Sequence, residues 1–263
     1  MEDKGTVTGK YTADRDGRML LAGVIDKERI SREKGILTTT AFMSEGERAM
    51  CEKFLRGEKL INFKWFGGYE NAERRMLAFY PEWMDGAENG DFPIAYIRAV
   101  FSEENMLSHR DFLGAVMGLL IKREMIGDIL PEKGSCDMIV SRNVAPVILS
   151  SLDKVGRANV KTAEISQGDL NIPEARFVVI KDTVASLRID SVISSGFKKS
   201  RESAARDVLS KKVSVNGLVC EKPDKTVGEG DTITCRGDGK MEISSVSGLS
   251  RKGRVIIEIK RFV

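Results

Sequence analysis

Basic side chains are concentrated in one short stretch near the C-terminal end of the sequence. Within residues 198–212 only two acidic residues, Glu202 and Asp207, oppose them. The basic residues of this stretch are Lys198, Lys199, Arg201, Arg206, Lys211 and Lys212. Ammonium and guanidinium groups at this density attract the phosphates of a polyanion. The stretch is therefore the first candidate for a binding surface, although a solvated basic face without a partner has the same composition.

The same stretch predicts how these charges are held. Ser200 is a good helix N-cap and apolar residues follow it at helical spacing, so we expect a helix that packs against an earlier one. The packing positions are Ala204, Ala205, Val208 and Leu209 on the second helix, and Leu187, Val192 and Ile193 on the first. The free N–H groups and the dipole at the start of the second helix favour a phosphate beside Lys198, Lys199 and Arg201.

The residues around this stretch closely resemble the S4 RNA-binding domain, over about residues 186 to 236. The matching positions are Leu187-Arg188-Ile189-Asp190, Gly196, Ser200-Arg201, Val213-Ser214-Val215-Asn216-Gly217 and Gly230-Asp231. The resemblance implies an RNA-binding surface. The residues expected to form it are Arg188, Lys198, Lys199, Ser200, Arg201, Arg206, Lys211, Lys212 and Asn216.

Structural roles are also expected at and beside this surface. Asp190 is expected to position Arg188 or Arg201 rather than to catalyse a reaction. Asn216-Gly217 is a two-residue hairpin signal. The run from Arg254 to Arg261 alternates apolar and polar residues and is expected only to complete a sheet.

Length and charge place this surface in a modular protein. A chain of 263 residues suits two or three domains. Residues 182–263 hold 16 Lys and Arg against 11 Asp and Glu, whereas residues 1–181 hold 26 against 28. We predict an α+β protein of three regions: a mostly helical region over 1–85, a split-βαβ (RRM-like) domain over 86–176, and an S4-type domain over 177–263.

The middle region is assigned from the order of its predicted elements. Strands are expected over 92–101, 125–130, 136–141 and 159–165, with helices over about 108–121 and 143–152, which gives β-α-β-β-α-β. The apolar stripe of the first helix is Phe112, Leu113, Val116, Met117, Leu120 and Ile121. The base-stacking RNP1 segment of an RRM does not occur. Possible secondary RNA contacts are Tyr96, Arg98, His109 and Arg110.

The first region contains fewer signals. Ser44 and Glu47 have capping-box spacing before a helix. A strand is expected over Ile61 to Phe66, then Gly67-Gly68, then a second helix over 71–80 that Pro81 closes. The two glycines could cradle a phosphate, but a turn that needs glycine geometry is the favoured interpretation.

The whole chain resembles the YlmH family. The matching motifs are Gly67-Gly68-Tyr69, Ala72-Glu73-Arg74, His109-Arg110-Asp111, Leu113-Gly114 and Gly127-Asp128-Ile129. The resemblance implies a non-enzymatic, cytoplasmic bacterial protein that associates with the large ribosomal subunit and tRNA and helps rescue obstructed translation. It implies no cofactor and a monomer when free.

Other classes of function are weighed against these motifs. The main alternative is an RNA-modifying enzyme of the pseudouridine-synthase type, but the H-R-L-D motif is missing and the S4-like segment is at the other end of the chain. A protein-interaction module in the acidic N-terminal two-thirds is a third possibility. No signal peptide, membrane span or zinc site is expected, because no apolar run approaches ~20 residues and the four cysteines are scattered.

Overall fold

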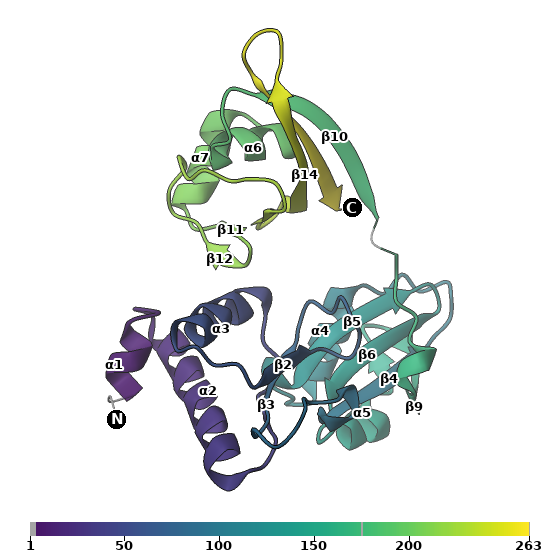
Figure 1. The fold of residues 1–263 in the computed structure, drawn as a ribbon. Coiled ribbons are helices and arrows are strands. Elements are labelled where there is room, and N and C mark those ends of the chain that lie inside the picture. The colour runs from purple at the N-terminus through teal and green to yellow at the C-terminus, as the bar shows by residue number, and fades with distance from the viewer. Residues whose placement is uncertain (1–3, 175, 263) are drawn as a thin grey trace. The chain divides into compact units, whose positions relative to one another are not determined.

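The computed structural model of the chain describes residues 4–174 and 176–262 (Figure 1). Its residues form two compact units, Met1–Pro173 and Glu174–Val263, called here the N-terminal and C-terminal units. Both units combine helices with antiparallel sheets, so the predicted α+β class is confirmed. The division into three domains stays a prediction. None of the described helices has both the length and the apolar composition needed to cross a bilayer.

The N-terminal unit begins with three helices and a small sheet. The helices are α1 (Lys4–Gly9), α2 (Arg15–Lys34) and α3 (Glu45–Gly57), and the strands are β1 (Thr38–Thr39), β2 (Phe63–Phe66) and β3 (Met76–Phe79) in the order β1-β3-β2. The capping box before α3 is confirmed: the Glu47 N–H donates to Ser44 Oγ at 3.4 Å, and the Ser44 N–H donates to the Glu47 carboxylate at 2.7 Å. The sequence therefore sets the start of α3 locally.

The predicted helix over 71–80 is wrong, because this segment contains β3. All four residues of β3 are buried. A central strand covered on both faces shows no alternation of apolar and polar residues, so its sequence pattern does not distinguish it from a helix. Pro81 consequently follows a strand.

The second part of the N-terminal unit has the predicted β-α-β-β-α-β order. Its main strands are β4 (Ile94–Val100), β5 (Ile126–Glu132), β6 (Ser135–Ser141) and β9 (Lys161–Ile165), in the antiparallel order β5-β6-β4-β9. Helices α4 (His109–Gly118) and α5 (Ala145–Ser151) pack on one face, and a short hairpin joins β7 (Lys154–Val155) to β8 (Ala158–Asn159). The apolar stripe on α4 is narrower than expected, since Met117 is 44% and Leu120 93% exposed. The helix ends at Gly118, before Leu120.

A shared core joins the two parts of the N-terminal unit. Ile139 and Tyr96, from strands of the second part, pack with Phe42 and Phe66 of the first. Gly67 and Gly68 form a turn that lies against this core. A Cβ on Gly67 would be 2.2 Å from the Arg74 carbonyl oxygen, and Gly68 has φ +101°. The turn therefore requires glycine at both positions, in agreement with the favoured interpretation.

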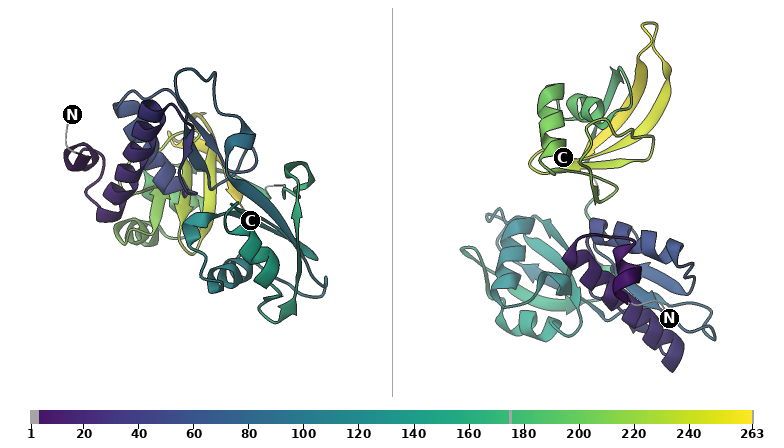
Figure 2. Two further views of the ribbon diagram at one scale, coloured as in Figure 1. Left: turned by 90° about the horizontal axis from the view of Figure 1, so that it is seen from below. Right: turned by 90° about the vertical axis from the view of Figure 1, so that its left-hand side faces the viewer.

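The C-terminal unit is a six-stranded sheet with two helices on one face (Figure 2). Its elements are β10 (Phe177–Val184), α6 (Ile189–Gly196), α7 (Arg201–Leu209), β11 (Val213–Val215), β12 (Leu218–Val219), β13 (Thr232–Cys235), β14 (Gly239–Leu249) and β15 (Val255–Phe262), with the strand order β10-β15-β14-β13-β11-β12. Ala204 and Val208 are fully buried, but Leu209, expected in the same face, is 63% exposed. Asn216 and Gly217 have φ +50° and +78°, which confirms the hairpin between β11 and β12.

Candidate nucleic-acid interface

The turn between α6 and α7 positions the basic stretch. Gly196 ends α6 against the sheet, where an added Cβ would lie 2.2 Å from Met241 Sδ. Lys198 then adopts a left-handed conformation with φ +53°, and Ser200 caps α7 by accepting from the Ser203 N–H at 3.1 Å. The side chain of Ser200 is thus committed to the helix end, while the backbone turn presents Lys198 to the surface.

A groove of about 460 Å³ runs beside this turn. It is lined by the end of β10, by α6, and by the turn into α7. Four of its lining residues are cationic, namely Lys198, Lys199, Arg201 and Arg254, and one, Asp182, is acidic. Among the side chains that the structure describes, Lys198 has no hydrogen-bond or ion-pair partner. The groove therefore offers unneutralised positive charge to an anion.

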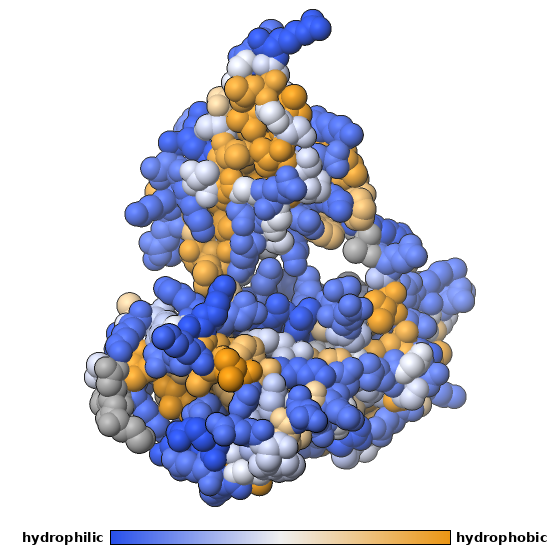
Figure 3. Space-filling model, in the orientation of Figure 1, coloured by the Kyte–Doolittle hydropathy of each residue, from blue (hydrophilic) through white to orange (hydrophobic). Residues whose placement is uncertain are grey.

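Arg254 belongs to this groove although the sequence interpretation assigned its strand only to the sheet. Its guanidinium donates to the Thr183 carbonyl and, at 3.1 Å, to Thr183 Oγ1. These bonds hold the arginine beside the end of β10. The run Arg251-Lys252-Gly253-Arg254 was the signal that could have identified it. In Figure 3 the end of the β14–β15 hairpin is hydrophilic, and apolar surface lies below it over the strands.

A buried carboxylate holds the two arginines of the S4-like motif. The Asp190 side chain is only 6% exposed and accepts from Arg188 Nη2 at 3.0 Å and from Arg201 Nε at 3.2 Å. Burial opposes the charge on this carboxyl, but the two guanidinium groups outweigh it and lower the pKa of Asp190. The arginine side chains themselves remain 40% and 51% exposed. Asp190 thus positions both arginines while leaving them accessible.

Lys199 differs from its basic neighbours in being enclosed by carboxylates. Its side chain is 15% exposed and forms ion pairs with Asp207, at 2.6 Å, and with Asp238. Burial opposes its charge, yet these carboxylates raise the pKa of Lys199. Asp207, Cys235 and Asp238 together have the composition of a metal-ligand set, but the Lys199 ammonium lies among them and supplies the cation. Lys199 therefore holds the turn to the sheet, and its predicted contact with RNA stays a prediction.

The other residues predicted to bind RNA also include both paired and unpaired side chains. Lys211 is paired with Glu221 at 2.9 Å and Lys212 with Asp207 at 3.6 Å. The Asn216 amide donates to Asp231 at 2.7 Å and accepts from the Thr232 N–H at 2.9 Å, so it stabilises the hairpin. Arg206 is exposed and, within the described part of the chain, has no side-chain partner.

Tyr96 and Arg98 both have partners within the protein. The Tyr96 hydroxyl donates to the Gly68 carbonyl at 3.1 Å, and its ring packs in the shared core. The Arg98 guanidinium donates twice to the buried Asp137, at 2.7 Å for each bond. Both side chains therefore contribute to the packing of the N-terminal unit, and their contact with RNA stays a prediction.

His109 and Arg110 lie exposed at the start of α4. Partial desolvation, with a smaller contribution from the charge of Arg123, lowers the pKa of His109. The imidazole is consequently neutral at neutral pH and offers no positive charge to a phosphate.

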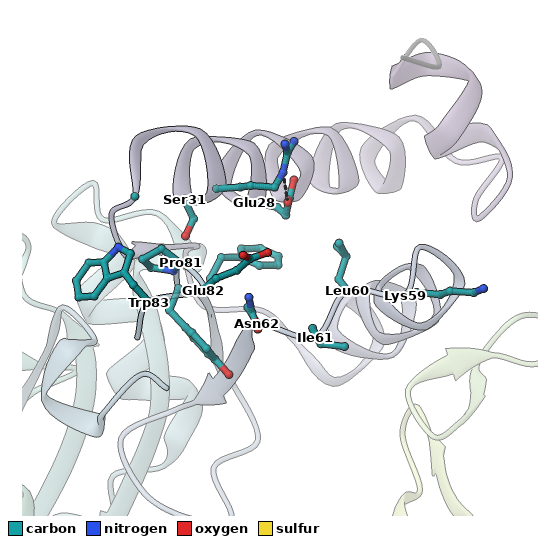
Figure 4. Close-up of a pocket in the computed structure, with 13 residues that line it drawn as sticks. Glu28, Ser31, Lys59, Leu60, Ile61, Asn62, Pro81, Glu82 and Trp83 are labelled. Carbon is teal, nitrogen blue, oxygen red and sulfur yellow. Dashed lines mark hydrogen bonds and ion pairs between the residues drawn. The ribbon is translucent and has the colours of Figure 1, made fainter. Parts of the chain in front are cut away.

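A cavity of about 410 Å³ between α2 and the loops after α3 and β3 has a different character (Figure 4). Its charges balance, because Glu28 and Glu82 accompany Arg32 and Lys59, and Glu28 accepts from Arg32 at 2.9 Å. Trp83 lies on its rim and is 73% exposed. Without excess positive charge, this cavity lacks the property that marks the groove of the C-terminal unit.

Comparison with known proteins identifies the family. A sequence model described as "Putative RNA-binding domain in YlmH" matches residues 87–169, and one described as "S4 domain" matches residues 187–233. A Bacillus subtilis (strain 168) protein named "Ribosome-associated protein quality control protein P2" is 30% identical over 248 residues, 94% of this chain and 96% of the relative. The chain belongs to the YlmH family.

The YlmH fold is also known from a solved structure. "Cell division protein ylmH from Streptococcus pneumoniae" matches 62% of this chain and 98% of its own, with a TM-score of 0.52 and 21% identity, which is a likeness of fold. Within this YlmH chain the S4 match ends at residue 233. Arg254 therefore lies outside the S4 match and yet lines the same groove as Arg201.

Proposed function

We propose that this protein is a non-catalytic RNA-binding factor that associates with the large ribosomal subunit, contacts ribosomal RNA and tRNA, and acts in the rescue or quality control of stalled translation. It works in the cytoplasm, needs no cofactor and is a monomer when free. The name of the Bacillus subtilis relative supports the ribosomal context. One observation carries the RNA-binding step: the groove of the C-terminal unit brings Lys198, Arg201 and Arg254 together.

Charge supports the choice of RNA as the ligand. The C-terminal unit, residues 174–263, holds 18 Lys and Arg against 12 Asp and Glu. A phosphate in the groove would accept from Arg201 and Arg254 while Lys198 closes the contact from the turn. Arg188 and Arg206 extend the cationic surface along the helices. Phosphate contacts of this kind position RNA without reading its sequence.

The proposal is tested by reversing the charge of the groove. The full-length triple variant Lys198→Glu, Arg201→Glu, Arg254→Glu should lose co-sedimentation with large ribosomal subunits, with affinity at least roughly 10-fold weaker. Its matched control is Lys34→Glu, Lys53→Glu, Lys59→Glu. The control residues are exposed and without side-chain partners in the described structure, and Lys59 has φ +54°, close to the φ of Lys198.

The two variants separate the possible outcomes. Loss of binding in the groove variant alone supports the proposal, provided that its circular dichroism spectrum is that of the wild type at the temperature of the assay. Its melting temperature should fall, because Arg201 pairs with the buried Asp190. Equal co-sedimentation of both variants would reject the groove as the RNA-binding surface. The pseudouridine-synthase alternative is tested by its own product: RNA recovered after incubation with the wild-type protein is digested to nucleosides, which are separated by chromatography because pseudouridine and uridine have the same mass. Conversion of uridine to its isomer would overturn the non-catalytic assignment.

A further inference from the structure

A second cavity, of about 420 Å³, lies within the N-terminal unit and is distinct from the cationic groove. Three of its lining residues are aromatic: Trp65, Phe66 and Tyr69. The others are polar: Glu70, Arg75, Asn89 and Gln167. Its size is within the range of small-ligand sites, and its two charged residues are of opposite sign.

The walls of this cavity are fixed by the surrounding structure. Trp65 and Phe66 belong to β2, and the Gly67-Gly68 turn leads directly to Tyr69. The Tyr69 hydroxyl donates to the buried Asp128 at 2.8 Å. The Arg75 guanidinium donates to the backbone carbonyls of Ala72, at 2.8 Å, and Glu70, at 3.0 Å. The Tyr69 side chain and the Arg75 guanidinium are therefore preorganised before any ligand arrives.

Two polar side chains at this cavity have no partner among the described residues. The side-chain amides of Asn89 and Gln167 are exposed and form no hydrogen bond within the described structure. Each amide offers both donors and an acceptor.

The two amides also come from the two ends of one domain. Asn89 lies in the 3-10 turn Asn89–Asp91 and Gln167 in the 3-10 turn Gln167–Asp169, and these turns begin and end the stretch that matches the RNA-binding domain of YlmH. The fold brings both turns to the same cavity, opposite residues that precede the matched stretch. The match therefore covers only part of the site.

We infer that this cavity binds one unstacked nucleobase of RNA, an inference that rests on the proposed RNA-binding function. Aromatic side chains provide stacking surfaces for a base taken out of a helix, and amides pair with the donors and acceptors on its edge. A phosphate is a poorer ligand, because Glu70 offsets the charge of Arg75. The cavity thus recognises the base, while the groove of the C-terminal unit binds backbone.

The two tryptophans of the chain allow a direct test. Trp83, which is 73% exposed, can be replaced by Phe so that Trp65 is the remaining fluorophore. The test protein is the full chain carrying Trp83→Phe and the three groove substitutions, which remove RNA binding at the other unit. Single-stranded hexaribonucleotides of A, C, G or U are titrated, and at least one should quench Trp65 fluorescence saturably.

Matched variants assign the quenching to the cavity. Adding Asn89→Ala and Gln167→Ala should weaken binding roughly 10-fold or more, since each amide–base pair contributes about 1–3 kcal/mol to discrimination. Asn143→Ala serves as the control because Asn143 is an exposed asparagine of the same domain that lines none of the cavities described above. An abasic hexamer of the same backbone should not quench Trp65.

Two results would overturn the inference: no quenching by any of the four hexamers, or equal quenching by the abasic hexamer. Ultraviolet crosslinking followed by peptide mapping gives an independent measurement, in which the attached base should map to the peptide containing Trp65 and Tyr69. If these experiments detect no base binding in the cavity, the proposed ribosome binding by the groove is not affected. The proposed function is instead rejected if the groove variant still co-sediments with large ribosomal subunits. The two hypotheses are therefore rejected by different observations.

Discussion

The two units of this protein differ in how they are suited to bind RNA. The C-terminal unit has an excess of six positive charges and a groove lined by four cations, whereas the N-terminal unit holds 24 Lys and Arg against 27 Asp and Glu. The cavity of the N-terminal unit is lined instead by aromatic rings, amides and one offset charge pair. Net charge attracts any phosphate chain over about 1 nm at physiological salt, but a stacked and hydrogen-bonded base is recognised only in contact. The difference indicates a division between affinity and recognition.

Adjacent residues of the C-terminal unit can also differ in whether they are suited to bind RNA. Lys198 and Lys199 are adjacent in sequence, yet only Lys199 is enclosed by carboxylates. The left-handed conformation of Lys198 turns the chain so that these two side chains have different environments. A basic stretch therefore contains both binding and structural cations, and substitution of all of them together would not distinguish RNA binding from folding.

The largest expected difference between the two units is in how their affinity for RNA depends on salt concentration. If three or four cations of the C-terminal unit contact phosphates, affinity for structured RNA should fall roughly 20- to 150-fold between 50 and 200 mM salt. Binding of a short oligonucleotide to the N-terminal cavity, in the groove variant, should change by less than about 3-fold, because it neutralises few phosphates. Fluorescence anisotropy at four salt concentrations measures both slopes. Equal slopes would contradict the proposed division.

The second expected effect is on the free energy of unfolding, to which Lys198 and Lys199 should contribute differently. Lys199→Ala leaves Asp207 and Asp238 close together without their shared cation, so the free energy of unfolding should fall by about 2–4 kcal/mol. Lys198→Ala removes an exposed side chain and should change it by less than about 0.5 kcal/mol. Urea denaturation of both full-length variants provides the measurement. A stable Lys199→Ala protein would show that this lysine is dispensable for folding.

A third prediction concerns the glycine turn that supports the aromatic cavity. Gly67→Ala places a Cβ 2.2 Å from the Arg74 carbonyl oxygen and should destabilise the protein by about 1–3 kcal/mol. Gly23→Ala is the matched control, since Gly23 is exposed within α2 and an added Cβ there meets no atom within 4 Å. This control should gain about 0.5–1 kcal/mol. Thermal melting of the two variants should therefore shift in opposite directions.

The smallest expected effect is the change in RNA affinity when His109 is replaced. Because its pKa is lowered, the imidazole is uncharged at pH 7, and His109→Ala should change RNA affinity by no more than a few-fold. Binding assays at pH 6 and pH 8 on both proteins provide the comparison. Complete loss of function in a folded His109→Ala protein would instead assign this residue an active role.

Much of the fold followed from local patterns in the sequence. The Ser44 capping box, the Asn216-Gly217 hairpin and the order of elements over 92–165 were all predicted, because each depends on residues close together in the chain. The segment 71–80 was misassigned, since β3 is buried on both faces and its neighbours, β1 and β2, are separated from it along the chain. Burial of this kind depends on tertiary packing and produces no alternation of apolar and polar residues in the sequence.

The sequence by itself determined that the C-terminal end would be basic, that its charges would gather at a helix entrance, and that the chain would resemble the YlmH family. Only the tertiary structure decided that Arg254 joins the groove, that Lys199 is enclosed, and that Asn89 and Gln167 meet the aromatic residues after β2. Charge and helix capping are properties of neighbouring residues. The surroundings of a side chain depend on segments that are distant in sequence and meet only when the chain folds.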